Sequence, residues 1–326
     1  MTKRFGDYDK SLSLESRLQK HRHSSSLARS ISEGCDDNMK AAFIGLGVMG
    51  YPMAGHCQRA GIEMTVYNRT AAKAQAWAAE FGGQWQKTPR EAVQNADIVL
   101  VCVGNDDDVR SVFYGDDGLL ASLKAGAIVV DHTTTSAELA RELSAAVAQH
   151  GGSFLDAPVS GGQAGAENGQ LSIMVGGTPQ AFAAAEPVFK CYGKVWQLLG
   201  EAGSGQLCKM VNQVCIAGIL QGLSEGLALA LKSGLDIPTV QQVLAGGAAQ
   251  SWQLQNRALT MAEGEYDFGF AIDWMVKDLG YCLQEAQSKG VDMPVASLVR
   301  GFYQELQKQG LNRCDTSVLL KRLTDQ

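Results

Sequence analysis

The sequence of 326 residues has no excess of basic residues, no long apolar run and no closely paired cysteines. Its 28 Lys and Arg against 34 Asp and Glu give a formal net charge of −6, and no surplus of positive charge is present to neutralise nucleic-acid or lipid phosphates. The longest purely apolar stretch, Ile98–Val103, falls far short of the roughly 18 residues that a membrane helix needs. We therefore expect neither a nucleic-acid nor a membrane partner.

The eight cysteines are scattered, and none forms a Cys-x-x-Cys pair. Zinc sites need clustered ligands, and disulfide frameworks belong to short secreted chains. The five histidines also lack the spacing of metal ligands. We expect reduced thiols that pack as small hydrophobes in the cytoplasm, and no metal site.

The first 38 residues differ in composition from the rest of the chain. They hold eight Ser, seven Lys or Arg and six Asp or Glu, with very few large apolar residues. No apolar core of a secretion signal is present, and the interspersed acids argue against an organellar transit peptide. We interpret residues 1–38 as a disordered extension without an assigned function.

From Lys40 onward, short apolar stretches alternate with helical patterns as far as about residue 203. The strands are predicted at 40–45, 64–67, 84–86, 98–103, 127–131, 154–155, 172–175 and 195–198. Thr135 and Glu138 are interpreted as the capping box of a helix that reaches His150. Strands that alternate with helices at this spacing predict βαβ units, and therefore an α/β fold with a doubly wound parallel sheet of the Rossmann type over residues 39–203.

Strand signals stop after Gly203. Residues 206–232 form one long helical pattern, and shorter ones follow to residue 324, so we predict a second, all-α domain over 204–326. In the long helix, Gly218, Gly222 and Gly226 recur every four residues. This stripe of small residues predicts that another helix packs very close, either within the domain or across a dimer.

A glycine-rich turn, Gly45-Leu-Gly47-Val48-Met49-Gly50, follows the first predicted strand and opens a helix. In that context Gly45 permits a tight turn, Gly47 lets the backbone approach a pyrophosphate, and Gly50 allows close packing of helix on sheet. The free N–H groups of the helix N-terminus attract phosphate. The motif predicts dinucleotide binding, although a strand–helix turn without a ligand can show the same glycines.

The second predicted strand is not followed by the acidic residue that usually binds the ribose hydroxyls of NAD. It ends instead in Asn68-Arg69-Thr70. Arg69 can form a charge-assisted bond to a 2′-phosphate, and Thr70 can add a hydroxyl. An arginine that is merely solvated at a helix start is the alternative. The position at the strand end favours the phosphate, so we predict that NADP(H) is preferred over NAD(H).

Lys209, Asn212 and Gln213 fall at i, i+3 and i+4 of the long helix and share one face among apolar neighbours. Such a lysine often only extends its ammonium to water. A lysine desolvated beside a cofactor, however, can act as a general acid or base. The residues alone leave both interpretations open.

Ser160, Gly161 and Gly162 follow the end of a predicted strand. A hydroxyl and unhindered backbone N–H groups suit a carboxylate, whereas a flexible loop is the simpler interpretation. The carboxyl end of a strand is where α/β sheets bind ligands, which favours the binding role.

Five motifs occur in the order seen in the β-hydroxyacid dehydrogenases, and the chain resembles that family from Met39 to nearly the C-terminus. The motifs are the Gly45–Gly50 turn, Asp131-His-Thr-Thr134, Asp156-Ala-Pro-Val-Ser-Gly-Gly162, Gly205-x-x-x-Lys209-x-x-Asn212-Gln213 and Lys277-Asp278-Leu279. The resemblance implies a Rossmann domain, and a helical domain that builds the active-site cleft and the dimer interface. It also implies an NAD(P)-dependent oxidoreductase that acts on a small, carboxylate-bearing β-hydroxyacid or semialdehyde, and assembles as a homodimer or homotetramer.

The resemblance also suggests individual roles. Lys209 resembles the family's catalytic lysine, and Ser160 to Gly162 its substrate-carboxylate loop. Cofactor contacts are expected from the glycine-rich turn, Asn68, Arg69, Thr70, Val103, Thr134 and Lys277. Many members have Asn four residues after the lysine, where this chain has Gln213, so either Asn212 or Gln213 is the amide that orients the substrate.

Two alternatives remain at this point. One is a sibling reductase such as an imine reductase, although those enzymes typically lack the lysine. The other is a catalytically silent NADP-binding scaffold, which would bind the cofactor without turnover.

Removal of residues 1–38 is expected to leave turnover and melting temperature nearly unchanged, because nothing in this segment is patterned to join a core. Thermal unfolding and steady-state kinetics of the truncated and full chains test this prediction. A loss of several degrees on truncation would show instead that the segment docks onto the folded protein.

Overall fold

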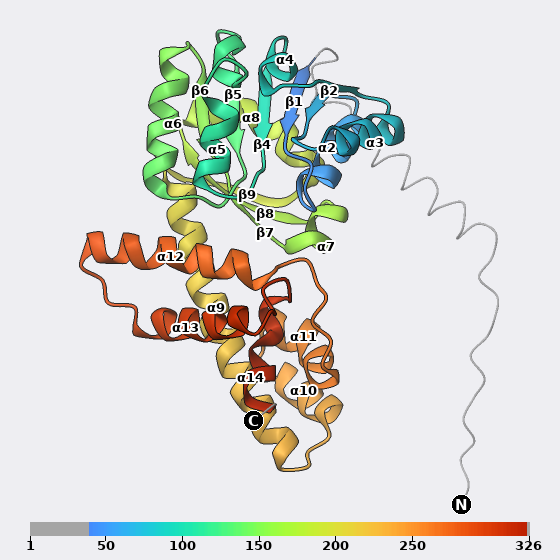
Figure 1. The fold of residues 1–326 in the computed structure, drawn as a ribbon, viewed down its shortest axis with the longest axis vertical. Coiled ribbons are helices and arrows are strands. Elements are labelled where there is room, and N and C mark those ends of the chain that lie inside the picture. The colour runs from blue at the N-terminus through green and yellow to red at the C-terminus, as the bar shows by residue number, and fades with distance from the viewer. Residues whose placement is uncertain (1–38, 325–326) are drawn as a thin grey trace, which may run out of the picture.

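The structure is a computed structural model that describes residues 39–324. The extension predicted over residues 1–38 lies outside the described residues. Figure 1 shows an α/β part, drawn at the top, and a helical part below it. The long helix α9 (Ser204–Lys232) runs from the first part into the second.

The α/β part consists of strands that alternate with helices, as predicted. Its strands are β1 (Lys40–Ile44), β2 (Glu63–Tyr67), β3 (Gln84–Trp85), β4 (Ile98–Val101), β5 (Ile128–Asp131), β6 (Ser153–Asp156), β7 (Val159–Ser160), β8 (Leu171–Gly177) and β9 (Gly193–Gly200). Its helices are α2 (Gly50–Arg59), α3 (Ala71–Phe81), α4 (Pro89–Val93), α5 (Asp106–Phe113), α6 (Ala137–Gln149), α7 (Gly162–Glu167) and α8 (Pro179–Tyr192).

The strands form one sheet in the order β3-β2-β1-β4-β5-β6-β8-β7, with β9 paired to β8. All pairs from β3 to β6 are parallel, which confirms the predicted doubly wound sheet. Strand β8, however, runs antiparallel to β6 and β7, because the chain returns through the short β7 and α7 rather than through a full crossover helix. The order reverses between β1 and β4, and ligands of such sheets bind at the carboxyl ends of the strands beside that point.

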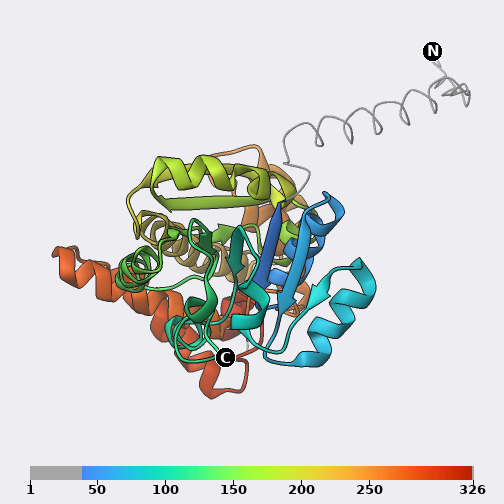
Figure 2. The ribbon, with the colours of Figure 1, turned by 90° about the horizontal axis from the view of Figure 1, so that it is seen from above.

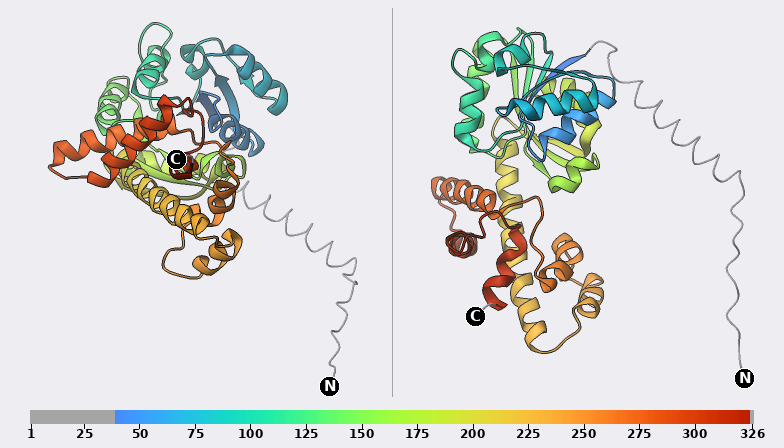
Figure 3. Two further views of the ribbon diagram at one scale, coloured as in Figure 1. Left: turned by 60° about the horizontal axis from the view of Figure 1, so that its bottom comes forward. Right: turned by 45° about the vertical axis from the view of Figure 1, so that its right-hand side comes forward.

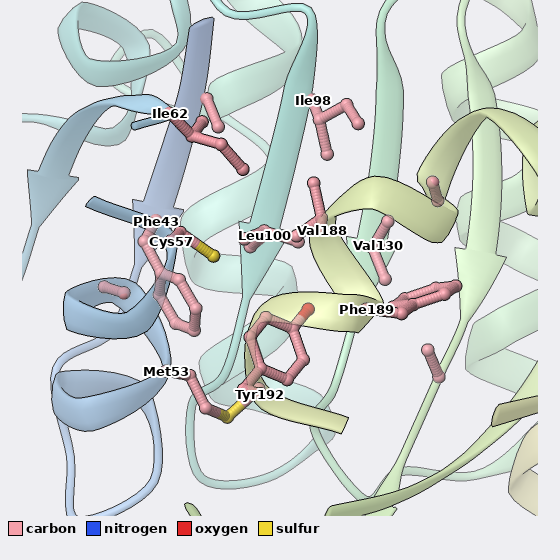
Figure 4. Close-up of a cluster of buried hydrophobic side chains, with 14 of the residues drawn as sticks. Phe43, Met53, Cys57, Ile62, Ile98, Leu100, Val130, Val188, Phe189 and Tyr192 are labelled. Carbon is pink, nitrogen blue, oxygen red and sulfur yellow. The ribbon is translucent and has the colours of Figure 1, made fainter. Parts of the chain in front are cut away.

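Helices cover both faces of the sheet, as the view from above in Figure 2 shows. Helices α2, α3 and α8 bury one face, and α4, α5 and α6 bury the other. In the first of these cores, Met53 of α2 and Tyr192 of α8 lie together beneath the strand residues Phe43 and Leu100 (Figure 4). Burial on both sides explains why strands such as Ile98–Val101 are continuously apolar.

Several predicted details need correction. Ser136, not Thr135, is the N-cap of α6, and its hydroxyl accepts the N–H of Leu139. The third residue after this cap is therefore Leu139 rather than Glu138, so the predicted capping box does not form. Strand β4 ends at Val101, two residues earlier than predicted. Helix α5 was not predicted, although Asn105 caps it through the N–H of Asp108.

The helical part is built around α9. Its other helices are α10 (Ile237–Ala245), α11 (Trp252–Glu263), α12 (Ile272–Lys289), α13 (Pro294–Lys308) and α14 (Lys321–Thr324), preceded by a short 3-10 turn at Thr316–Leu320. Figure 3 shows these helices along the sides of α9. A core of α9, α12 and α13 side chains includes Met275, Val299 and Tyr303, all of which are fully buried.

The glycine stripe of α9 has no close neighbour among residues 39–324. A Cβ placed at Gly218, Gly222 or Gly226 would meet nothing within 4 Å, so a packing partner within the domain is excluded for the described residues. By length and composition α9 is also the one described helix that could cross a membrane, with a third of its most apolar window buried. Buried polar side chains such as Gln206 and Gln221 interrupt its packed faces.

The first turn of α9 is fixed to the sheet by a buried carboxylate. Asp156, at the end of β6, accepts the backbone N–H groups of Gly203 at 2.7 Å and Gln206 at 2.8 Å. A Cβ at Gly205 would lie only 2.4 Å from the carbonyl oxygen of Met174 in β8, so this turn and the strands are in close contact. The contact sets the point at which α9 leaves the sheet.

Asp156→Ala is expected to lower the free energy of unfolding by about 2 kcal/mol, since it leaves two buried N–H groups without an acceptor. Asp236→Ala, at the exposed N-cap of α10, is the matched control and should have a much smaller effect. Urea unfolding of the three proteins is the measurement. Equal losses in the two variants would contradict a special role for Asp156.

Candidate active site

The glycine-rich turn lies at the carboxyl end of β1 and leads into α2. Gly45 has φ +101°, and a Cβ there would lie 2.2 Å from the Cys102 carbonyl oxygen, while a Cβ at Gly50 would lie 2.0 Å from the Gly45 carbonyl oxygen. Neither position has room for a side chain. Gly47, by contrast, has nothing within 4 Å of a Cβ. This open backbone beside a helix N-terminus fits the pyrophosphate of a dinucleotide.

Val48 and Met49 complete this turn. Val48 is an exposed apolar residue at 55% exposure, and Met49 is half-buried at the N-cap of α2. Asn68, at the end of β2, accepts the N–H of Leu46 at 2.9 Å and donates to the Thr70 carbonyl at 3.1 Å. Asn68 therefore holds the turn in shape from the neighbouring strand.

Arg69 and Thr70 lie at the outer end of the same edge, and both are exposed. The guanidinium of Arg69 lies 3.3 Å from the carboxylate of Asp108 on α5. Because the Arg69 side chain is 87% exposed, this ion pair is weak and its charge is accessible to a solvent-borne anion. Thr70 is the N-cap residue of α3, but its side chain caps no N–H group.

The loops that follow β4 and β5 are in contact with each other, and the first of them packs against Gly45. The N–H of Val103 donates to the Thr133 hydroxyl at 3.0 Å. The carbonyl of Thr134, one residue further, accepts from Lys277 of α12 at 2.5 Å. Lys277 thus connects the helical part to the loop after β5. Its ammonium also lies over the ring of Tyr281, 5.1 Å from the ring centre.

Lys209 is buried at the junction of the two parts, with 7% of its surface exposed. Its ammonium donates to the carbonyl of Val159 at 2.9 Å, and Val159 directly precedes the Ser160 turn. Burial lowers the pKa of Lys209 to about 8, and the charge of nearby Lys277 adds to this effect. The negative charge of Asp278 opposes the shift, as to a smaller degree do Cys282 and Cys208. A lysine with such a pKa exchanges protons near neutral pH.

The predicted serine–glycine loop faces Asn212. The Ser160 hydroxyl donates to the Asn212 side-chain carbonyl, with an oxygen–oxygen distance of 3.4 Å. Gly161 and Gly162 have φ +133° and +61°, a backbone that other residues rarely adopt, and they form the start of α7. Two segments some fifty residues apart in sequence therefore come together at Lys209 and Asn212.

Gln213 faces away from the serine loop. It is 1% exposed, donates to the Asp278 carboxylate at 2.6 Å and accepts from the Asn212 amide at 2.8 Å. Asp278 lies within the Lys277-Asp278-Leu279 motif, but neither its charge nor its position in the sequence predicted this contact. Its other oxygen lies 3.0 Å from the Lys277 ammonium but has no hydrogen bond, alone among the buried side-chain polar atoms of residues 39–324. That contact is therefore Coulombic rather than directional.

Matches to known families divide at the start of α9. The model of the NAD-binding domain of 6-phosphogluconate dehydrogenase matches residues 40–203. The model described as NAD-binding of NADP-dependent 3-hydroxyisobutyrate dehydrogenase matches residues 203–323.

Individual proteins agree with these models. An uncharacterized oxidoreductase of Shewanella frigidimarina is 57% identical over 87% of this chain and 98% of its own. The 2-hydroxy-3-oxopropionate reductase of Escherichia coli is 34% identical over 87% of this chain and 97% of its own. The solved structure of Mycobacterium tuberculosis 3-hydroxyisobutyrate dehydrogenase with L-serine matches with a TM-score of 0.80 and 29% identity, and covers 88% of this chain and 99% of that one.

The chain is an NAD(P)-binding oxidoreductase. Its glycine turn fits a dinucleotide, and its two parts match the two family models over residues 40–203 and 203–323. The chain belongs to the β-hydroxyacid dehydrogenase family, which includes 3-hydroxyisobutyrate dehydrogenase and 2-hydroxy-3-oxopropionate reductase. It is accordingly a dehydrogenase or reductase that acts on hydroxyl groups.

Proposed function

We propose that the protein transfers hydride between NADP(H) and a small β-hydroxyacid or semialdehyde, with Lys209 as the general acid or base. The observation that supports this most strongly is the burial of the Lys209 ammonium against Val159, directly before the Ser160 loop. A lysine that only extended its charge to water would be exposed at its tip. Here the ammonium is desolvated, and its pKa is lowered to about 8.

NADP(H) is the proposed cofactor. The Gly45–Gly50 turn and the N-terminus of α2 would hold its pyrophosphate, and Arg69 and Thr70 would hold the 2′-phosphate. Support comes from the exposed guanidinium of Arg69 and from the lack of an acidic residue at the end of β2, where Asn68 bonds the turn itself. Val103, Thr134 and Lys277 are proposed to line the remainder of this edge.

In the proposed mechanism the bound nicotinamide supplies or accepts the hydride. During reduction the Lys209 ammonium donates a proton to the substrate oxygen, and during oxidation the neutral amine accepts the hydroxyl proton. Ser160, with the backbone N–H groups of Gly161 and Gly162, holds the substrate carboxylate, and Asn212 orients it. These groups come from both parts of the chain, so the reacting carbon lies between the proposed NADP-binding domain (39–203) and substrate domain (204–326).

A homodimer or homotetramer is part of the same proposal. Three apolar side chains of α9 are exposed, Val211 at 64%, Ile219 at 41% and Leu229 at 70%. The glycine stripe of the same helix has no close contact in the described part of the chain. A second copy packed along α9 would bury these side chains. The described cysteines are free thiols, which is consistent with the reducing cytoplasm that we propose as the location.

Lys209→Ala is expected to lower turnover about a hundredfold or more on the best substrate from a panel of small β-hydroxyacids and semialdehydes. Lys209→Arg should also be poor, because a guanidinium does not release its proton near neutral pH. In the unmutated protein, reduction should slow and oxidation should quicken as the pH rises through about 8, the pKa of Lys209.

Steady-state kinetics at several pH values and NADPH titration by fluorescence quenching are the measurements. NADPH affinity should hardly change in either variant. Near-normal turnover of Lys209→Ala would show a structural lysine and an incorrect mechanism. Cofactor binding without turnover on any compound of the panel would instead favour a silent NADP-binding scaffold.

Arg69→Ala is expected to raise the KM for NADPH and to leave the KM for NADH nearly unchanged, because only NADPH carries the 2′-phosphate that Arg69 would bind. The unmutated protein should prefer NADPH by kcat/KM. Parallel titrations with both cofactors test this selectivity, and a preference for NADH in the unmutated protein would contradict the assignment.

A further inference from the structure

A chain of hydrogen bonds, buried at Asp278 and half-buried at Asn212 and Ser160, connects α12 to the serine loop. It runs from Asp278 to Gln213 at 2.6 Å, from Gln213 to Asn212 at 2.8 Å, and from Ser160 to Asn212 at 3.4 Å. Asp278 and Gln213 are only 2% and 1% exposed. Buried polar chains of this kind fix the orientation of their members, because a reversed amide would leave groups unpaired.

The charge of Asp278 determines the direction of every bond in this chain. An ionised carboxylate can only accept hydrogen bonds, so Gln213 must turn its NH₂ group toward Asp278. The Gln213 carbonyl then faces Asn212, which must present its own NH₂ group there. The Asn212 carbonyl is consequently left facing the Ser160 hydroxyl.

We propose that Gln213 and Asp278 are positioning residues, and that Asn212 alone is the amide that meets the substrate. Asp278 orients Gln213, and Gln213 holds Asn212 with its carbonyl oxygen toward the Ser160 loop. This deepens the proposed function and decides between the two amides that the motif offers. Each amide donates one N–H and keeps the other, but Gln213 is 1% exposed and has short bonds at both ends, at 2.6 and 2.8 Å. Asn212 is only half-buried, and its contact to Ser160 is long, at 3.4 Å, and easily exchanged.

The length of the Gln213 side chain matters to this arrangement. Gln213 bonds Asp278 and Asn212 at the same time, at 2.6 and 2.8 Å, and an asparagine at this position would be one methylene shorter. Asp278 also faces the two lysines of the site, since it lies 3.0 Å from the Lys277 ammonium and raises the pKa of Lys209 against the effect of burial. Substitution of Gln213 should therefore weaken substrate binding, whereas substitution of Asp278 should mainly change the pKa of Lys209.

Gln213→Met removes the hydrogen bonds and keeps nearly the same volume. The matched control is Gln221→Met, on the same helix, where a glutamine that is 8% exposed bonds only to Glu225. Gln213→Met should raise the KM for the carboxylate substrate about tenfold, the value of about one hydrogen bond. It should lower kcat less, and leave NADPH affinity and the pH profile unchanged. Gln221→Met should change none of these.

Asp278→Asn tests the charge separately. An asparagine can still accept from Gln213 but no longer excludes the reversed amide, so KM should rise less than in Gln213→Met. The loss of negative charge should lower the pKa of Lys209, so that reduction slows at a lower pH than before. Among the groups that act on this lysine, Lys277 and the thiols Cys208 and Cys282 are unchanged in the variant.

Binding of malonate, a carboxylate that cannot be reduced, to the enzyme–NADP⁺ complex gives a readout that needs no turnover. Calorimetric titration should show weaker malonate binding in Gln213→Met than in Gln221→Met. Equal KM and malonate affinity in these two variants would overturn the inference. So would a large loss of kcat at constant KM in Gln213→Met, since this would make Gln213 the reacting amide. Weakened malonate binding in a protein that turns over no substrate would support the inference and refute the proposed function.

Discussion

The position of α9 depends on the buried carboxylate of Asp156. Asp156 lies at the end of β6, and by accepting two N–H groups of the first turn of α9 it fixes both where the helix starts and where it points. Lys209, Asn212 and Gln213 lie within the next three turns. A carboxylate bonded in this way costs desolvation, and burial does raise the pKa of Asp156, while the backbone N–H groups oppose that rise.

Beyond the start of α9, polar groups of the α/β part and of the helical part meet at one junction. The sheet contributes backbone carbonyls at Val159 and Thr134, and the helical part contributes the ammonium groups of Lys209 and Lys277. The carboxylate of Asp278 attracts both lysines: it forms an ion pair with Lys277, and its charge raises the pKa of Lys209. The buried Lys209 and the half-buried Lys277 beside one negative charge leave a local positive excess, which suits the proposed substrate carboxylate and anionic cofactor.

The Gly45–Gly50 turn and the polar face around Lys209 depend on different features of the structure. The glycine turn needs only space, since Gly45 and Gly50 lack room for a Cβ while Gly47 stays open. The Lys209 face needs orientation, because the role proposed for it depends on which atom of each amide and carboxylate faces Lys209 and the Ser160 loop. The space needed by the glycine turn is a local property of the chain, and the neighbouring Arg69 can remain exposed. The orientation of the Lys209 face involves contacts across fifty to sixty-five residues of sequence.

Periodicity and glycine placement in the sequence determined the alternation of strands and helices, the parallel sheet and the turn after β1. These features depend on neighbours within one or two turns of chain, where side-chain pattern and backbone sterics decide. Only the tertiary structure decided that β8 runs antiparallel to β6, that no described helix covers the glycine stripe, and that Gln213 faces Asp278. A helical spacing of i, i+3 and i+4 places three polar residues on one face, but the direction of each amide is set by what lies opposite, and here that is a carboxylate on a helix sixty-five residues away.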